Sequence, residues 1–216
     1  MVRKSLYLGL AIFAFLLLTK EAQAISFGFK GGYNLVNFTV KPTNPGTPQL
    51  KNSQTLSGGL YLAFRLGPFS LQPEFLYTRR GTRFNFYDDS VKYQAEYWLE
   101  YLEGVLLLKW KIITLGPANP FILAGPSFGY LSQASIAVFD ESGAKVISAD
   151  TMDYFKKTEL AAVFGAGVGF KLSVVKISIE CRYHLGLSNV ARMSGPEMEA
   201  ESIKNKSYSL LISIGF

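Results

Sequence analysis

Apolar and polar residues alternate with a period of two along most of the chain that follows residue 24. Such alternation is typical of β-strands with one apolar and one polar face, whereas helical periodicity is hard to find here. The segments that carry it are each roughly ten residues long, which is the length that a tilted strand needs to cross a bilayer. The eight segments are 26–36, 56–66, 69–79, 97–112, 121–131, 159–172, 176–188 and 207–216.

The connections between these segments alternate between long and short. The long ones are 37–55, 80–96, 132–158 and 189–206, and the short ones are 67–68, 113–120 and 173–175. Bacterial outer-membrane barrels have short periplasmic turns and longer outer loops. An even number of strands brings both chain ends to one side, so we expect both ends to face the periplasm.

The composition of the polar face distinguishes a membrane barrel from a soluble one. A solvated sheet face is expected to be dense in Lys, Glu and Thr, but this face is dominated by Gly, Ser and Ala with isolated charges. Small residues suit the interior of a narrow barrel that side chains only just fill. We therefore predict an all-β fold, an eight-stranded antiparallel up-and-down transmembrane β-barrel with its apolar face toward lipid. A soluble, lipocalin-like barrel is the alternative.

Aromatic residues stand near the ends of the predicted strands, on the apolar face. Aromatic girdles are expected at both membrane interfaces of such barrels, although aromatics favour strands in general. The residues concerned are Phe27, Tyr77, Trp110, Tyr208 and Phe216.

Residues 1–24 have the features of a secretory signal peptide. Arg3 and Lys4 precede a 13-residue apolar stretch, Leu6 to Leu18, and Ala22-Gln23-Ala24 supplies a small-residue cleavage site. We expect residues 1–24 to be removed and residues 25–216 to form one barrel domain in the bacterial outer membrane. An uncleaved anchor helix is the alternative.

Composition and charge narrow the expected partners and the possible fold classes. Hydrophobic residues make up 49% of the chain, and the formal net charge is +6. The basic residues are dispersed rather than clustered in a run, so nucleic acid is not an expected partner. Cys181 is the only cysteine, which excludes a disulfide-stapled fold.

Three motifs resemble those of the PorT-like family of small Bacteroidetes outer-membrane β-barrel proteins. Residues 28–35 (GFKGGYNL) resemble its opening G-x-K-x-G-x-N-x, and residues 180–187 (ECRYHLGL) resemble its E-x-R-Y-x-x-G-L segment. Residues 101–109 (YLEGVLLLK) resemble its Y-L-E-I-P-L-L-L-K strand, with Gly104-Val105 in place of Ile-Pro. The resemblance implies an eight-stranded outer-membrane barrel. The family's namesake belongs to a protein-secretion pathway, so envelope or secretion proteins are among the implied partners.

Isolated charges on the polar face are the residues that we single out. Buried charges need partners, because removing one leaves the other uncompensated at a cost of about 3–5 kcal/mol. We predict that these charges form a paired network that plugs the lumen, with a hydrated lumen of loosely paired charges as the alternative. The set is Lys30, Arg65, Glu74, Glu103, Lys109, Glu180 and Arg182.

The sequence offers little catalytic chemistry. His184, the only histidine, has the opposite strand parity to Cys181, so the two are not placed to ligate one metal ion. We interpret His184 as part of a packed polar interior. Gly165, Gly167 and Gly169 lack the helix that follows a nucleotide-binding loop, so we interpret them as relieving crowding in a narrow barrel. No catalytic residue, metal or cofactor is predicted.

Two regions bear on partners. Residues 80–96 combine arginines with aromatics, a composition that suits contact with a protein or a polysaccharide. The interpretation that we favour for these residues is that they continue the neighbouring strands past the membrane. Phe216 ends the last segment in line with Tyr208, and this resembles the signal that the outer-membrane insertion machinery reads. We therefore expect that machinery and outer-membrane lipid as partners. The predicted role is structural or interactive and not enzymatic, with a narrow porin-like channel or, less favoured, an outer-membrane hydrolase as alternatives.

Overall fold

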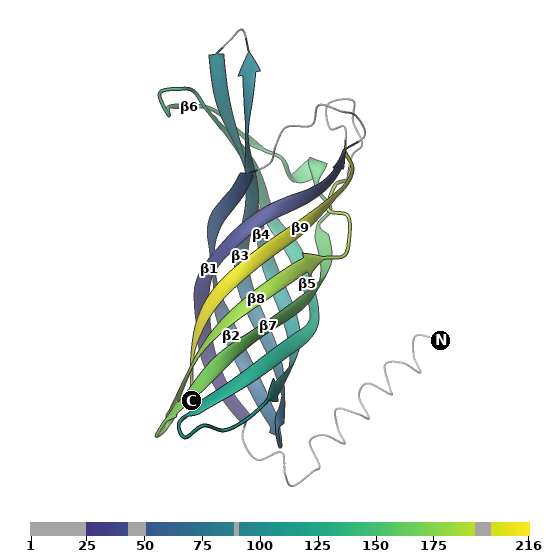
Figure 1. Cartoon of the computed structure of the whole chain (residues 1–216). Helices are drawn as coiled ribbons and strands as arrows, with labels where there is room; N and C mark the ends of the chain where they lie inside the picture. Colours follow the sequence, from purple (N-terminus) through teal and green to yellow (C-terminus); the bar gives the residue numbers. More distant parts are fainter. Residues whose placement is uncertain (1–24, 43–50, 89–90, 193–199) are drawn as a thin grey trace, which may run out of the picture.

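The computed structural model describes residues 25–42, 51–88, 91–192 and 200–216, and most of them lie in strands (Figure 1). The strands are β1 (Ile25–Pro42), β2 (Lys51–Leu66), β3 (Phe69–Asp88), β4 (Val91–Lys111), β5 (Ala118–Phe139), β6 (Lys145–Asp150), β7 (Thr158–Leu172), β8 (Val175–Gly186) and β9 (Ala200–Gly215). A short 3-10 helix, η1 (Met152–Tyr154), follows β6. Within these residues, no helix is long and apolar enough to cross a membrane.

Eight of the strands form a closed antiparallel ring. Their order is β4-β3-β2-β1-β9-β8-β7-β5, and pairing between β4 and β5 closes the ring. Strand β6 lies outside the ring, because it pairs only with the upper end of β5, from Ser135↔Asp150 to Phe139↔Lys145. The prediction of an all-β, eight-stranded, up-and-down barrel is confirmed.

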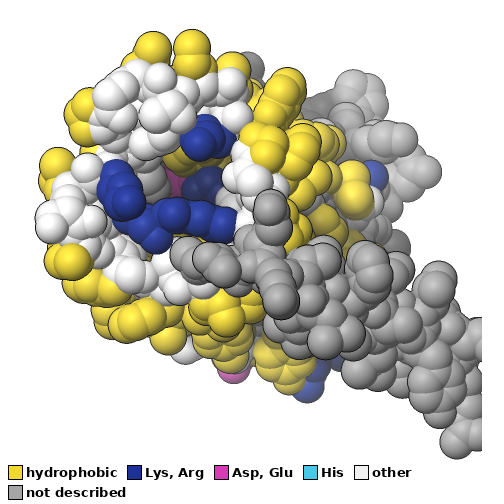
Figure 2. Space-filling model, turned by 90° about the horizontal axis from the view of Figure 1, so that it is seen from below, with side chains coloured by type: hydrophobic (Ala, Val, Ile, Leu, Met, Phe, Trp, Pro, Cys, Tyr) yellow, Lys and Arg dark blue, Asp and Glu magenta, His cyan; other side chains and the backbone are white. Residues whose placement is uncertain are grey.

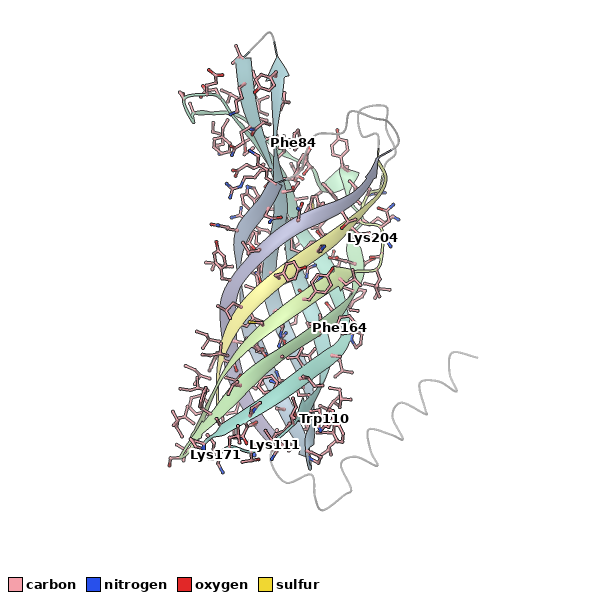
Figure 3. All side chains as sticks on the ribbon, viewed as in Figure 1. Phe84, Trp110, Lys111, Phe164, Lys171 and Lys204 are labelled. Atoms are coloured by element: carbon pink, nitrogen blue, oxygen red, sulfur yellow. The ribbon has the colours of Figure 1, made fainter. Side chains whose placement is uncertain are left out.

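The period-two pattern of the sequence corresponds to the two faces of the wall. Along β9, Ile212 is 52% exposed on the outside, whereas its neighbours Leu211 and Ser213 are 3% and 4% exposed in the lumen. All five predicted girdle aromatics also point outward; Figure 3 labels Trp110 near the end that carries the chain terminus and Phe164 at mid-height. The apolar face is therefore the outer face, as a barrel in lipid requires and a soluble barrel does not.

The strands are longer than the alternating segments of the sequence at the end away from the chain termini. Strand β3 runs to Asp88 and β4 begins at Val91, so the favoured interpretation of residues 80–96 as extended strands is confirmed. The interpretation of 132–158 as a loop was wrong, because β5 continues to Phe139 and is followed by β6 and η1. Beyond the bilayer, neither face of a strand must meet lipid, so pairing continues where the apolar alternation fades.

The two ends of the described chain meet at the opposite, short-turn end of the barrel, called here the terminal end. The backbone N–H of Phe216 donates to the carbonyl of Phe27 at 2.9 Å. The β2–β3 turn at this end is only two residues long, and Gly67 adopts a φ of +64°, which glycine accommodates without strain. The predicted signal peptide, residues 1–24, lies outside the described residues.

Candidate functional site

The centre of the lumen nearer the terminal end contains a network of ion pairs, called here the first charge layer and formed by Lys30, Glu74, Lys109, Glu180 and Arg182. Arg182 binds both carboxylate oxygens of Glu74, at 2.7 Å each, and also binds Glu180 at 2.7 Å. The Lys30 ammonium lies 2.6 Å from Glu74 and also contacts Glu180. Lys109 reaches the other oxygen of Glu180 at 3.3 Å. The side chains of Lys30, Glu74 and Glu180 are fully buried.

The sequence of β7 and β8 explains how these long side chains fit. Alternation along β8 turns Glu180 and Arg182 into the lumen, and the residues paired with them on β7 are Gly167 and Gly165. A Cβ atom at Gly167 would lie against the Phe121 ring and the Glu180 side chain. The glycines therefore leave room for the charged side chains that stand opposite them.

A second charge layer lies further from the terminal end and is formed by Arg80, Glu103, Glu159 and His184. Arg80 donates to Glu159 at 2.5 Å and to Glu103 at 2.7 Å. The Nε2 atom of His184 is 3.1 Å from Glu103, and Ser127 donates a hydrogen bond to the same carboxylate. Arg80 is only 1% exposed, so its charge is compensated inside the barrel.

An apolar cluster, called here the cap, fills the barrel beyond the second charge layer. It brings together side chains of β1, β4, β5 and β9 with residues of the two long connections. Its members are Phe38, Leu99, Tyr101, Leu131, Ala134, Phe155, Val190, Ala191 and Ile203. The lumen is thus occupied by two charge layers and an apolar cap in succession.

The structure distributes the seven predicted lumen charges over three places. Five of them make the first charge layer, and Glu103 belongs to the second. Arg65 joins neither layer and instead lines the open mouth at the terminal end. The two predicted insertion-signal residues, Tyr208 and Phe216, are exposed on the outer face by 57% and 50%.

Sequence reasoning missed Arg80 and Glu159, and it considered His184 only as a packed polar residue. Arg80 was assigned to a connection, although it continues the inward parity of Glu74 and Thr78 on a longer β3. Extending that parity past the expected strand end would have found it. Within the described chain, no group of three His, Cys, Asp or Glu side chains is placed to hold a metal ion.

The sequence model described as "Outer membrane protein beta-barrel domain" matches residues 20–192. No curated protein matches the sequence.

Several solved structures are similar to this chain. Neisserial surface protein A (NspA) is 13% identical, with 89% of this chain and 98% of that chain covered and a TM-score of 0.45. The attachment invasion locus protein Ail of Yersinia pestis is 15% identical, with coverages of 88% and 98% and a TM-score of 0.40. The outer membrane protease OmpT from Escherichia coli is 9% identical, with coverages of 90% and 97% and a TM-score of 0.39.

Proposed function

Because the chain belongs to the outer membrane protein beta-barrel domain family, we propose that it is an outer-membrane protein with a closed lumen and a structural or interaction role. The observation that supports this proposal is the filled interior. Two layers of buried ion pairs and the apolar cap succeed one another along the barrel axis. Eight-stranded barrels are in general just wide enough for side chains to fill.

The ion pairs are arranged so that a passing ion would have to break several of them. The bidentate contact between Arg182 and Glu74 crosses the lumen from β8 to β3, and Arg80 on β3 links β4 and β7 through Glu103 and Glu159. Bidentate Arg–carboxylate pairs are among the strongest and most directional hydrogen-bonded pairs in proteins. His184 is 5% exposed and held between Glu103 and Arg80, which also removes it from a substrate's reach.

The part of the molecule left to meet a partner is the crown, formed by the described residues of 83–96 and 135–150, which rises beyond the ring in Figure 1. Stacked aromatic pairs stiffen its long hairpin, with ring centroids 6.1 Å apart for Phe84–Tyr97 and 5.5 Å apart for Phe86–Tyr93. Tyr87 is 72% exposed on the same hairpin. Rigid, exposed aromatics bind partners with little loss of conformational entropy. We place the crown outside the cell and the termini in the periplasm, since the short turns lie at the terminal end.

A conductance measurement tests the closed lumen. We expect the purified barrel, inserted into a planar lipid bilayer, to give no steady ion current, because the ion-paired layers leave no continuous water-filled path. A water-filled porin in the same bilayers is the positive control. A large, steady current through the wild-type protein would contradict the closed lumen and would support the narrow-channel alternative.

Shortening the crown tests whether it is separate from the barrel. Residues 85–94 are replaced by Asn-Gly, which joins the paired residues Phe84 and Ala95 by a tight turn. We expect the variant to keep its heat-modifiable migration on gels, because the ring pairings below Phe84 are retained. In intact cells, the set of proteins that cross-link to it from outside should shrink relative to wild type. A folded variant with an unchanged cross-linked set would contradict an interaction role for this hairpin.

A further inference from the structure

The terminal end of the barrel is hollow. A cavity of about 430 Å³ opens there, and its lining includes Lys109 of the first charge layer. Figure 2 looks into this mouth and shows dark-blue Lys and Arg side chains gathered across it. The cations that line it are Arg65, Lys109, Lys111, Lys171 and Lys176.

These five cations converge on the cavity because of strand parity. They come from β2, β4, β7 and β8, and each continues the inward-facing series of its strand, as Lys176 does before Ser178 and Glu180. Near the membrane surface, basic side chains that faced outward would meet lipid headgroups. These side chains face one another across the cavity instead.

The cations of the mouth are short of anionic partners. Among the described residues, only Lys109 has an ion pair, and its partner Glu180 is already shared with Lys30 and Arg182. Lys171 and Lys176 stand directly opposite each other in the β7–β8 hairpin. Like charges in directly opposite positions destabilise a sheet, so folding places these two lysines together at a cost.

We propose that this mouth is a binding site for an anion that carries two or more phosphate groups, a site that goes beyond the closed-lumen role proposed above. Four of the five cations are lysines, which bind phosphate as compact point charges, and the fifth, Arg65, has a planar fork that matches phosphate oxygens. Neutral donors line the same cavity, among them the hydroxyls of Ser26, Ser70 and Ser178. A ligand with several phosphates would satisfy cations on opposite walls at once.

Two sources share this chemistry, a free polyphosphate and the headgroup of a phospholipid that carries two phosphates, such as cardiolipin. The outermost cations, Lys111 and Lys171, are exposed and are labelled at the lower rim in Figure 3, where both kinds of ligand have access. The test therefore has one arm for each source.

The test compares the full barrel in a non-ionic detergent with two triple variants. The mouth variant carries Lys111→Gln, Lys171→Gln and Lys176→Gln. The matched control carries Lys145→Gln, Lys157→Gln and Lys204→Gln, which removes the same charge at the other end of the barrel. Inorganic tripolyphosphate is titrated by calorimetry, and phospholipids retained from mixed phosphatidylcholine and cardiolipin vesicles are quantified by mass spectrometry.

We expect tripolyphosphate to bind wild type and the control with one saturable site that weakens as salt rises. The mouth variant should bind at least about tenfold more weakly, since each charge-assisted contact is worth about that factor. If tripolyphosphate does not bind but cardiolipin enrichment is lost only in the mouth variant, the site holds and its ligand is the headgroup. Binding in neither arm, or equal loss in both variants, would overturn the proposal.

Discussion

Replacing Glu180 by alanine is expected to lower the free energy of unfolding of the barrel by about 3–5 kcal/mol. Glu180 contacts Lys30, Lys109 and Arg182, and it is 0% exposed. Without it, Lys109 would lose its ion pair, and Lys30 and Arg182 would share the single carboxylate of Glu74. The free energy is measured by reversible urea unfolding in detergent micelles, followed by tryptophan fluorescence and by the heat-modifiable gel shift.

The control for this substitution is Glu100→Ala, which removes a carboxylate from a more exposed pair. Glu100 lies 3.4 Å from Arg79 and both side chains retain solvent contact, so the expected loss is at most about 1 kcal/mol. A second variant, Glu180→Ala with Lys30→Met, removes one of the stranded cations and should recover part of the lost stability. Equal effects of Glu180→Ala and Glu100→Ala would show that the first charge layer does not stabilise the barrel.

The wall of the barrel was predictable from the sequence because lipid imposes a strict rule on it. Every outward position within the bilayer must be apolar, and every inward position lies in a narrow lumen. Leu210 and Leu211 are the same type of residue, so only their places in the alternating series show that Leu210 faces outward and Leu211 faces the lumen. The same rule distinguished the outer aromatics from the inner charges. It holds only within the bilayer, so the alternation alone does not mark the outer ends of β3, β4 and β5.

The partners inside the lumen could not be predicted in the same way. Parity shows that Glu74 and Arg182 both face inward, but their contact joins residues 108 positions apart on strands that are not neighbours in the ring. Such a contact depends on register, tilt and ring closure together. Arg80 shows the same limit, since its pairing with Glu159 needs both a longer β3 and the closed ring. The cavity lined by Arg65 was likewise not predictable from parity, because its position depends on where along the barrel the charge layers end.

Placing a charge on the outer face at mid-height gives the most direct test of the lipid boundary. Ile212 lies on β9 midway between Tyr208 and Phe216, the two outward aromatics expected at opposite interfaces, and it is 52% exposed. Ile212→Arg is expected to lower the free energy of unfolding in phospholipid vesicles by about 2–4 kcal/mol, because the guanidinium would face hydrocarbon at the bilayer midplane. Urea titration of folding into vesicles, with the gel shift as readout, measures the difference.

The matched control is Leu35→Arg, which makes a similar exchange on the same outer face but at the level of Tyr208, its partner on β9. Near the interface the cost falls to about 0–1 kcal/mol, since the side chain reaches water and headgroups there. Both substitutions change one exposed aliphatic residue, so loss of strand packing is similar in the two and cancels in the comparison. What remains is the depth of each site in the membrane. If the two arginines cost the same, Ile212 does not face hydrocarbon, and the outer apolar belt would have to be covered by something other than lipid.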